Sequence, residues 1–432
     1  MKSHGKWIWV GAALAVVATG ASWGYVARSK YDHRKGFPLL NEIYATNPAE
    51  VRDDGRVLMG GRSPAEYFDH VLLLLKEQFV DPIRDETPLA HGAVTSMLQS
   101  LRDPGSRFYT AEGWKRHLAE MEGEYEGLGA SMVILWKGED ADTQLPLTIV
   151  SVFEGGPADK AGIKAGDVIE EIDGRWVASR SLFRELAVAG EKRRNGEITE
   201  EEYQKEFERL RDKSLNAISI NRAIEILEKP SDEPIKLTVM RNGKPVKTDV
   251  RLDSGQFEPI SKEGEVIRIR SFGHGVDVKL ADLLGSSESV TIDIRNNFGG
   301  SFEVMERCLA LLIPKGEYAK LLTKRSKEPA PLSLSTGAER IRQITVVVDK
   351  GTAREAEVFA AALRDRSKAK VLGGETAALG ILCDRFTLAD SSGYTITRGR
   401  FADLSETLLY SMQSDSAAKS EDAKKVAGGA SQ

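Results

Sequence analysis

Cysteine and histidine are scarce in this chain. Its 432 residues contain two cysteines, Cys308 and Cys383, and six histidines that are scattered along the sequence. This spacing offers no Cys/His cluster that could form a metal centre. The two cysteines allow one disulfide, which the spacing neither predicts nor excludes. We therefore expect no metal and no other cofactor.

An excess of basic charge is also missing. The 60 lysines and arginines are outnumbered by 65 aspartates and glutamates, which gives a net charge of −5. That balance excludes the electrostatic footprint of a nucleic-acid-binding protein. Apolar residues make up 41 % of the chain, as in ordinary globular proteins, and the length suits two or three domains of about 150 residues each. The order of segments described below predicts an α+β multidomain protein.

A run without any charged residue lies close to the N-terminus. It extends from Trp7 to Ala27, follows two lysines, and is long enough to cross a bilayer as a helix. Aromatic residues stand near both of its ends, as they do at membrane interfaces. We predict an N-terminal membrane helix and signal anchor within residues 1–35. The alternative is a signal peptide cleaved beside the small residues at 18–20.

Residues 36–123 are predicted to form a tether followed by a helical region. Ser63 precedes Pro64, and Glu66 completes the pattern of a capping box, so a helix should begin there. Two more helices are expected over residues 88–101 and 111–121, with a turn between them. At the other end of the chain, residues 413–432 contain few large apolar side chains and are predicted to be disordered.

Residues 124–255 resemble a PDZ domain of the bacterial type. The sequence EYEGLGASMVILW places a glycine-rich loop before a strand, and LTIVSVFEGGPADKAGIKAGDVIEEIDG matches the pattern that follows in such domains. Asn242-Gly243 predicts a hairpin turn in the closing strands. The resemblance implies a groove that captures the C-terminus of a protein partner by strand addition. Taken alone, the glycine loop is better explained as a plain turn, and the motif that follows it favours the PDZ interpretation. The implied peptide-binding residues are Gly127, Leu128, Gly129, Ala130 and Met132.

Residues 178–230 depart from the PDZ pattern, which would supply one short helix there. Instead the segment is rich in Glu, Lys and Arg, and Thr199 with Glu202 forms a second capping-box pattern. We predict a charged helical insertion of one or two long helices. Two interpretations stay open, a solvated hairpin packed on its own domain and an arm that binds a partner.

Residues 256–412 alternate between apolar strands and helices, which predicts an α/β domain. One strand ends in DIRNNFGG, and a later one leads into VVVDKGTAREAEVFAAALRDRSKAKVLGGET. In this order, behind a PDZ-like domain, these motifs resemble the carboxyl-terminal processing peptidases, serine peptidases of the periplasm and chloroplast lumen with a Ser–Lys dyad. The resemblance implies a peptidase-like core in the bacterial envelope, anchored in the inner membrane. The basic residues after Ala27 would by themselves favour the opposite orientation.

The resemblance also assigns the catalytic positions. The family nucleophile corresponds to Arg354, the lysine base to Leu379 and the orienting glutamine to Cys383. An arginine stays protonated and has no lone pair with which to attack a carbonyl. The backbone N–H groups that would hold the oxyanion belong to Gly299, Gly300 and Glu355. We therefore expect an envelope pseudopeptidase that binds protein C-termini as an adaptor, scaffold or regulator.

Three alternatives remain open at this point. A displaced peptidase site could use Cys383 or Ser367 as the nucleophile and a lysine at 350, 368 or 370 as the base. The chain could also be a structural component of an envelope complex, in which the insertion matters more than the groove. Arg354 itself could pair with Glu357 or with a bound carboxylate. The implied partners are protein C-termini, an active peptidase paralogue or another copy of this chain, with no nucleic acid.

Overall fold

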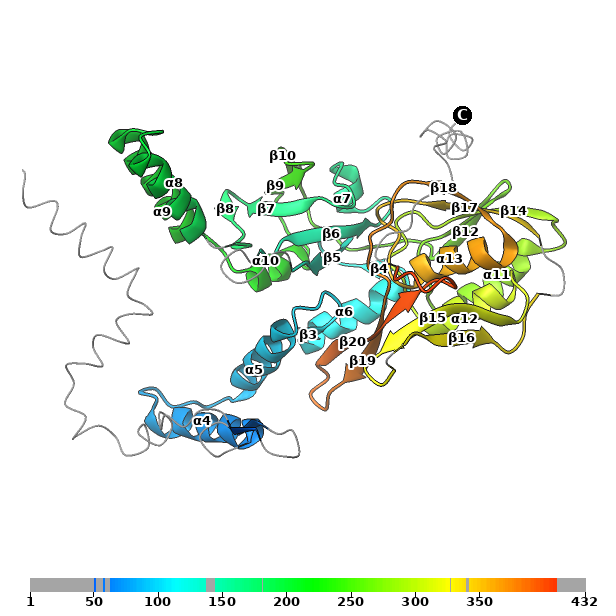
Figure 1. The fold of residues 1–432 in the computed structure, drawn as a ribbon, viewed down its shortest axis with the longest axis horizontal. Helices are drawn as coiled ribbons and strands as arrows, with labels where there is room; N and C mark the ends of the chain where they lie inside the picture. Colours follow the sequence, from blue (N-terminus) through cyan, green and yellow to red (C-terminus); the bar gives the residue numbers. More distant parts are fainter. Residues whose placement is uncertain are drawn as a thin grey trace, which may run out of the picture. The chain divides into compact units, whose positions relative to one another are not determined.

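The computed structural model describes residues 50–51, 57–58, 63–136, 144–180, 182–326, 328–338 and 342–409 (Figure 1). The predicted anchor from Trp7 to Ala27 and the predicted disordered tail at 413–432 lie outside these residues. Within them, no helix combines the length and apolar character that crossing a membrane requires. The chain divides into two compact units, residues 1–88 and 89–432, so their boundary falls inside the segment predicted as one helical region.

The first unit contains helix α4 (Pro64–Gln78) and the short antiparallel pair β1 (Glu50–Val51) and β2 (Val57–Leu58). The predicted capping box is confirmed at the start of α4. The Ser63 N–H donates to the Glu66 carboxylate at 2.7 Å, and the Glu66 N–H donates to Ser63 Oγ at 3.3 Å. These bonds satisfy backbone donors that the first helical turn leaves without partners.

The second unit begins within α5 (Thr87–Ser100), which is followed by β3 (Arg107–Tyr109) and α6 (Ala111–Met121). The bounds of both helices agree with the predicted ranges to within one residue. The prediction of a plain turn between them was wrong in part, because β3 pairs antiparallel with a strand near the C-terminus. That partner lies almost three hundred residues away, and a local pattern cannot reveal such a pairing.

The PDZ-like domain is a six-stranded sheet in the order β10-β9-β7-β6-β5, with β8 paired to β7 (Figure 1). The predicted Asn242-Gly243 turn joins β9 to β10, and both residues adopt positive φ as a hairpin of this type requires. Strand β5 lies at one edge of the sheet. The strands are β5 (Ala130–Ile134), β6 (Leu147–Val152), β7 (Val168–Ile172), β8 (Arg175–Trp176), β9 (Ile235–Arg241) and β10 (Lys244–Val250).

The helical insertion is narrower than the sequence predicted. Helices α8 (Phe183–Arg194) and α9 (Glu200–Leu215) contact each other, and the capping box at Thr199 is confirmed. Helix α10 (Ile220–Leu227), by contrast, buries its apolar face in the core of the PDZ-like domain, as does α7 (Pro157–Lys160). Helix α10 is therefore the short helix that the PDZ pattern calls for. It was included in the insertion because charged residues lie on both sides of it.

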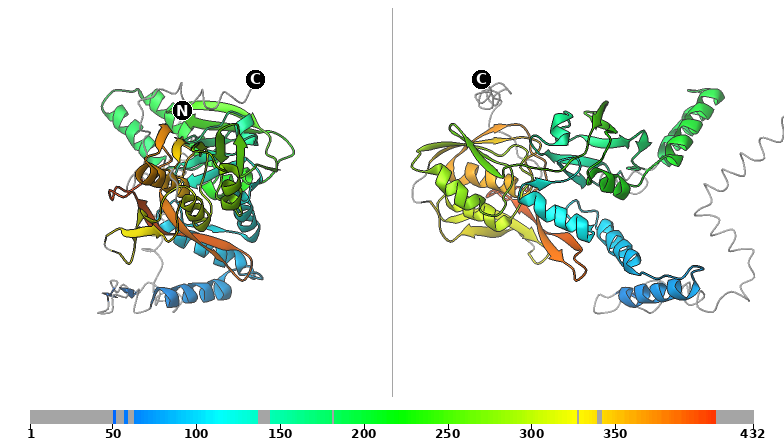
Figure 2. Two further views of the ribbon diagram at one scale, coloured as in Figure 1. Left: turned by 90° about the vertical axis from the view of Figure 1, so that its right-hand side faces the viewer. Right: turned by 180° about the vertical axis from the view of Figure 1, so that it is seen from behind.

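The C-terminal domain contains two sheets with three helices between them. The first sheet has the order β12-β13-β14-β17-β18 and is parallel except for β12, and the second has the order β16-β15-β20-β19, extended by β3. Helix α13 contacts β17 and β18 on one side and β15 on the other, as the views in Figure 2 illustrate. The bounds are β12 (Ile260–Glu263), β13 (Val266–Ile269), α11 (Val276–Leu284), β14 (Ser289–Asp293), α12 (Phe302–Ala310), β15 (Gly316–Thr323), β16 (Ala330–Leu334), β17 (Gln343–Val348), α13 (Glu355–Ser367), β18 (Lys370–Gly373), β19 (Ile381–Thr387) and β20 (Gly393–Ala402).

The predicted site motifs meet because β14 and β17 are parallel neighbours. Their carboxyl ends lie at the same edge of the sheet, so the loop after β14 and the turn after β17 approach each other. The Thr352 hydroxyl donates to the Ile294 carbonyl at 2.9 Å, and the Ala353 N–H donates to the Asn297 carbonyl at 2.8 Å. A further antiparallel pair, β4 (Glu124–Tyr125) with β11 (Gly255–Gln256), connects the entry and exit of the PDZ-like domain.

Candidate active site

Arg354 stands on a sharp turn between β17 and α13. Its backbone adopts φ 53° and ψ −120°, a region that residues with a Cβ rarely enter. A strand, a strained turn and a helix in succession are the geometry that presents a catalytic nucleophile. The turn therefore has the backbone of a nucleophile position, while its side chain is an arginine.

Glu357 holds this turn in place from the first turn of α13. Its carboxylate is fully buried and accepts hydrogen bonds from the Arg354 N–H at 3.1 Å, the Thr376 hydroxyl at 2.5 Å, and the N–H groups of Ala378 and Leu379 at 2.9 Å each. Burial raises the pKa of Glu357 to about 7, although these bonds oppose the rise. Glu357 thus contacts the backbone of Arg354 and fastens it to the loop that contains Leu379.

The backbone groups predicted to hold an oxyanion already have an anion beside them. The Gly300 N–H donates to the Glu355 carboxylate at 3.2 Å, and the Glu355 N–H donates to the same carboxylate. The Glu355 side chain is 2 % exposed and lies so close to Gly299 that a Cβ there would overlap it. Burial raises the pKa of Glu355, while Arg385 and Arg354 oppose that shift. A tetrahedral oxyanion would compete with this carboxylate for the same donors.

Leu379 and Cys383 lie near Arg354, but neither can supply the missing chemistry. Leu379 packs in an apolar cluster with Val133, Val150 and Ala353. Cys383 is a free, buried cysteine whose Sγ lies 3.7 Å from the Gly105 carbonyl. Burial raises the pKa of its thiol even though Arg354 favours the thiolate, so the nucleophilic form is disfavoured.

The other candidate nucleophile and the candidate lysine bases also lie in surroundings that do not suit catalysis. Ser367 is the last residue of α13, at the opposite end from Arg354, and its hydroxyl donates to the Leu363 carbonyl at 2.7 Å. The lysines at 350, 368 and 370 are exposed, whereas a lysine that acts as a general base is kept neutral by burial.

A small pocket beside Arg354 contains titratable groups that the sequence reading missed. Burial, with Arg385, Arg354 and Arg107 nearby, holds the pKa of His117 well below its ordinary value. Burial and then the Glu228 carboxylate raise the pKa of Glu120 to about 8. His117 and Glu120 follow Gly113 and Arg116 on α6 at helical spacing, and this stripe is the signal that could have revealed them.

The same pocket extends to the edge of the PDZ-like sheet. Its walls include Ala130, Ser131 and Met132 at the start of β5, together with Leu227 at the end of α10. The predicted glycine loop lies next to it, and Gly127 and Gly129 both have positive φ. The Leu128 side chain is buried in the domain core and its N–H donates to the Leu227 carbonyl at 2.7 Å. The peptide-binding residues therefore border the cavity that contains Arg354, and their role stays a prediction.

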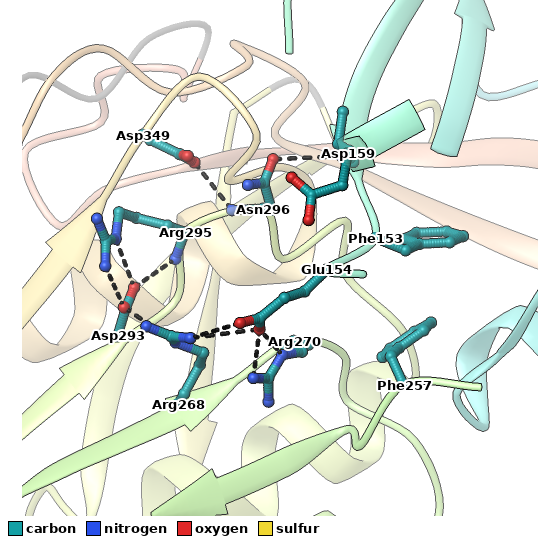
Figure 3. Close-up of a pocket in the computed structure, with 11 residues that line it drawn as sticks. Phe153, Glu154, Asp159, Phe257, Arg268, Arg270, Asp293, Arg295, Asn296 and Asp349 are labelled. Atoms are coloured by element: carbon teal, nitrogen blue, oxygen red, sulfur yellow. Dashed lines mark hydrogen bonds and ion pairs between the residues drawn. The ribbon is translucent and has the colours of Figure 1, made fainter. Parts of the chain in front are cut away.

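A second pocket joins the PDZ-like domain to the loop after β14 (Figure 3). Glu154 forms ion pairs there with Arg268, at 3.1 Å, and with Arg270. Asn296, in the motif that leads to Gly299, accepts a hydrogen bond from the Val152 N–H at 3.2 Å and donates its own N–H to Asp349 at 2.9 Å. The oxyanion-type loop is thereby tied to the PDZ-like sheet.

Substitutions of Asn296 should separate the stability that comes from its side-chain bond to Val152 from the stability that comes from its backbone conformation. Its φ of 55° is left-handed, which costs most residues about 1–2 kcal/mol and costs asparagine and glycine little. Asn296→Gly removes the bond to Val152 and should lower the free energy of unfolding by about 1 kcal/mol. Asn296→Ala adds the backbone cost and should lose about 2 kcal/mol or more. Chemical denaturation measures both, and equal losses would contradict a role for the backbone conformation.

Comparison with known proteins agrees with this arrangement. Residues 265–410 match the peptidase family S41 model, and residues 148–182 match a PDZ domain model. The chain is 25 % identical over 309 residues to a probable CtpA-like serine protease of Staphylococcus aureus, covering 69 % of this chain and 53 % of that protein. A namesake from Staphylococcus haemolyticus is 23 % identical over 307 residues, covering 68 % and 52 % respectively. The chain thus spans about half the length of these curated relatives.

Among solved structures, the photosystem II D1 C-terminal processing protease superposes with a TM-score of 0.55. The alignment covers 87 % of this chain and 91 % of that one, at 19 % sequence identity. At this level of identity the similarity concerns the fold. It agrees with the sequence resemblance to the carboxyl-terminal processing peptidases.

Proposed function

Because this chain belongs to the carboxyl-terminal processing peptidase family, we propose that it is a member without peptidase activity that binds polypeptide C-termini. The observation that carries the proposal is the pair Arg354 and Glu355. The first residue puts a permanent cation where a nucleophile would attack, and the second directs its own carboxylate at the oxyanion donors. Either change opposes acyl transfer, and the apolar surroundings of Leu379 leave no base to compensate.

The binding half of the proposal is supported by the edge of the PDZ-like sheet. Strand β5 pairs with β6 on one side, and among the described strands it has no partner on the other. An extended polypeptide can add to such an edge through main-chain hydrogen bonds, while pockets for its side chains provide selectivity. The pocket beside Ser131 and Met132 adjoins this edge.

The role we assign is that of an adaptor, scaffold or regulator in the bacterial envelope. The charge-free run from Trp7 to Ala27 supports anchoring in the inner membrane with the remainder in the periplasm. An active peptidase of the same family or a second copy of the chain is the assembly partner we favour. The α8–α9 hairpin offers a further surface for such a partner, because the side chains along α9 are predominantly charged.

Titration with short peptides tests the binding proposal. We expect a peptide of alternating Val and Ala residues ending in Leu to bind at micromolar concentrations, since strand addition and one apolar pocket contribute modestly to affinity. Isothermal titration calorimetry on the full chain measures the dissociation constant. Absence of binding by any such peptide would reject the proposal, and Lys350→Gln, an exposed substitution outside the lining of the pocket, serves as a surface control.

A further inference from the structure

The pocket beside Arg354 contains polar side-chain atoms that have no hydrogen-bond partner among the described residues. The Arg354 guanidinium makes no hydrogen bond or ion pair among the described residues, although its backbone N–H is bonded to Glu357. Two buried neighbours, Arg116 Nε and His117 Nε2, also have no hydrogen-bond partner in the part of the chain that is described. Buried polar atoms are nearly always paired, so these two atoms, next to a half-buried guanidinium, indicate a partner supplied by a ligand.

The charged groups around the pocket also favour an anionic ligand. Arg107 is neutralised by Glu228, which it contacts at 2.8 Å, and Arg116 lies 3.8 Å from both Glu228 and Glu126. Glu355, the acid adjacent to Arg354 in the chain, is engaged by the Gly300 N–H. Glu120 is the remaining carboxyl group of the pocket, and its pKa of about 8 leaves it predominantly protonated at neutral pH. Among the described carboxyl groups none forms an ion pair with the Arg354 guanidinium, and Glu355 acts on it only through its charge at longer range.

The size and position of the pocket limit what can fill it. Its volume of about 40 Å³ suits a few water molecules or one small anionic group. Its walls run from Arg354 to Ala130 and Ser131 at the edge of β5, so a polypeptide added to that edge could direct a carboxylate into it. The Leu128 N–H, one of the groups that a PDZ loop would offer to a terminal carboxylate, is already bonded to Leu227.

We propose that this pocket binds a carboxylate of the polypeptide that adds to β5, with the Arg354 guanidinium as its counter-ion. The inference rests on the proposed peptide binding and specifies where the anionic group of the ligand lies. Arginine suits this role because its planar fork can donate two parallel bonds to one carboxylate. The former nucleophile position thereby becomes an anchoring position for the ligand. The carboxylate can come from the C-terminus or from an Asp or Glu side chain.

Three versions of one peptide distinguish these sources. The first is the Val/Ala peptide ending in Leu with a free carboxylate, the second is its C-terminal amide, and the third is the amide with one internal Glu. If the terminal carboxylate is the ligand, amidation should weaken binding about tenfold to a hundredfold, as expected for a charge-assisted hydrogen bond. If a side chain is the ligand, the Glu-containing amide should bind more tightly than the plain amide by a similar factor. Equal affinities for all three peptides would overturn the proposal.

Variants of Arg354 provide the second arm of the test. Arg354→Met keeps the length of the side chain and removes its charge, so it should abolish the difference between the acid and amide forms. Arg354→Lys keeps a point charge and should retain part of that difference. Lys350→Gln, an exposed change in the same turn, should leave it unaltered. An unchanged preference of Arg354→Met for the acid overturns the carboxylate site while leaving peptide binding intact, whereas no binding by the wild type rejects peptide binding itself.

A pH profile of the wild type keeps the test informative if the Arg354 variants fold poorly. Raising the pH through about 8 ionises Glu120 and adds a negative charge near Arg354, so affinity for the carboxylate should fall across this range. Glu120→Gln should remove the fall, and a fall that persists in this variant counts against the site. The groups that face Glu120 in this pocket are Glu228, Arg107, Arg354, Arg116, His117 and Tyr109.

Discussion

An unfolded polypeptide with an apolar C-terminus should remain uncut by the wild-type protein. A serine peptidase of this family needs a nucleophile, a neutral lysine base and free oxyanion donors, and the corresponding positions are Arg354, Leu379 and the donors beside Glu355. Loss of nucleophile and base leaves activity about a thousandfold or more below that of a complete site. Fragment analysis by mass spectrometry after prolonged incubation measures the outcome.

Restoring one residue should not restore activity. Arg354→Ser alone would provide a hydroxyl without a base, beside an oxyanion site that Glu355 still fills. The four-residue variant Arg354→Ser, Glu355→Ala, Leu379→Lys, Cys383→Gln supplies all three functions. A lysine at 379 would lie among Val133, Val150 and Ala353, where desolvation lowers its pKa toward the neutral form that a base requires. We expect this variant to exceed the wild type by about a thousandfold or more.

The control for this experiment is the double variant Arg354→Ala, Cys383→Ala. Cleavage by the wild type that persists in this double variant would mean that the peptidase site lies elsewhere on the chain. Cleavage that disappears would mean that one of these two residues takes part in catalysis. Either result contradicts the proposed loss of activity, and only the first leaves the carboxylate-binding pocket untouched.

The largest loss of stability should follow from Glu357→Ala. The substitution leaves the N–H groups of Arg354, Ala378 and Leu379 without their acceptor in the buried turn, and it removes one bond of the Thr376 hydroxyl. Each buried donor without a partner costs about 1–3 kcal/mol. The free energy of unfolding should therefore fall by about 4 kcal/mol or more, at the upper end of what single substitutions cause.

Thermal unfolding followed by circular dichroism measures this effect, with an expected decrease in Tm of roughly 10 °C. Glu375→Ala is the matched control, because Glu375 is exposed in the same loop and should change Tm by no more than about 1 °C. Glu357→Gln keeps one carbonyl acceptor, so its Tm should lie between the Tm values of Glu357→Ala and Glu375→Ala. A Glu357→Ala variant as stable as the control would show that the turn does not depend on this carboxylate.

Local signals in the sequence located most of the elements. The capping boxes at Ser63 and Thr199 mark helix starts, and Asn242-Gly243 marks a hairpin, because each pattern acts through bonds between near neighbours in the chain. The strand ending at Asp293 and the turn containing Arg354 were also assigned correctly. What joins them is the parallel pairing of β14 with β17, which follows from the alternation of strands and helices.

The site was only partly predictable, because its contacts join residues that lie far apart in the chain. The role of Glu355 depends on its side chain turning back toward Gly300, 55 residues earlier in the chain. The pairing of Arg107 with Glu228 spans 121 residues, and the raised pKa of Glu120 depends on burial that composition does not reveal. Such contacts arise only when distant segments pack, whereas the positions of Arg354, Leu379 and Cys383 were assigned through the resemblance to the carboxyl-terminal processing peptidases.

The backbone of Arg354 also has a consequence for the order of folding. A non-glycine residue at this φ and ψ costs of the order of 1–3 kcal/mol, so the turn cannot form stably alone. Its supports come from Ile294 and Leu379, which lie 58 and 22 residues from the groups they bond in the turn and its helix. We infer that the turn closes late, after the parallel strands have paired. Interactions gained there should slow unfolding more than they speed folding.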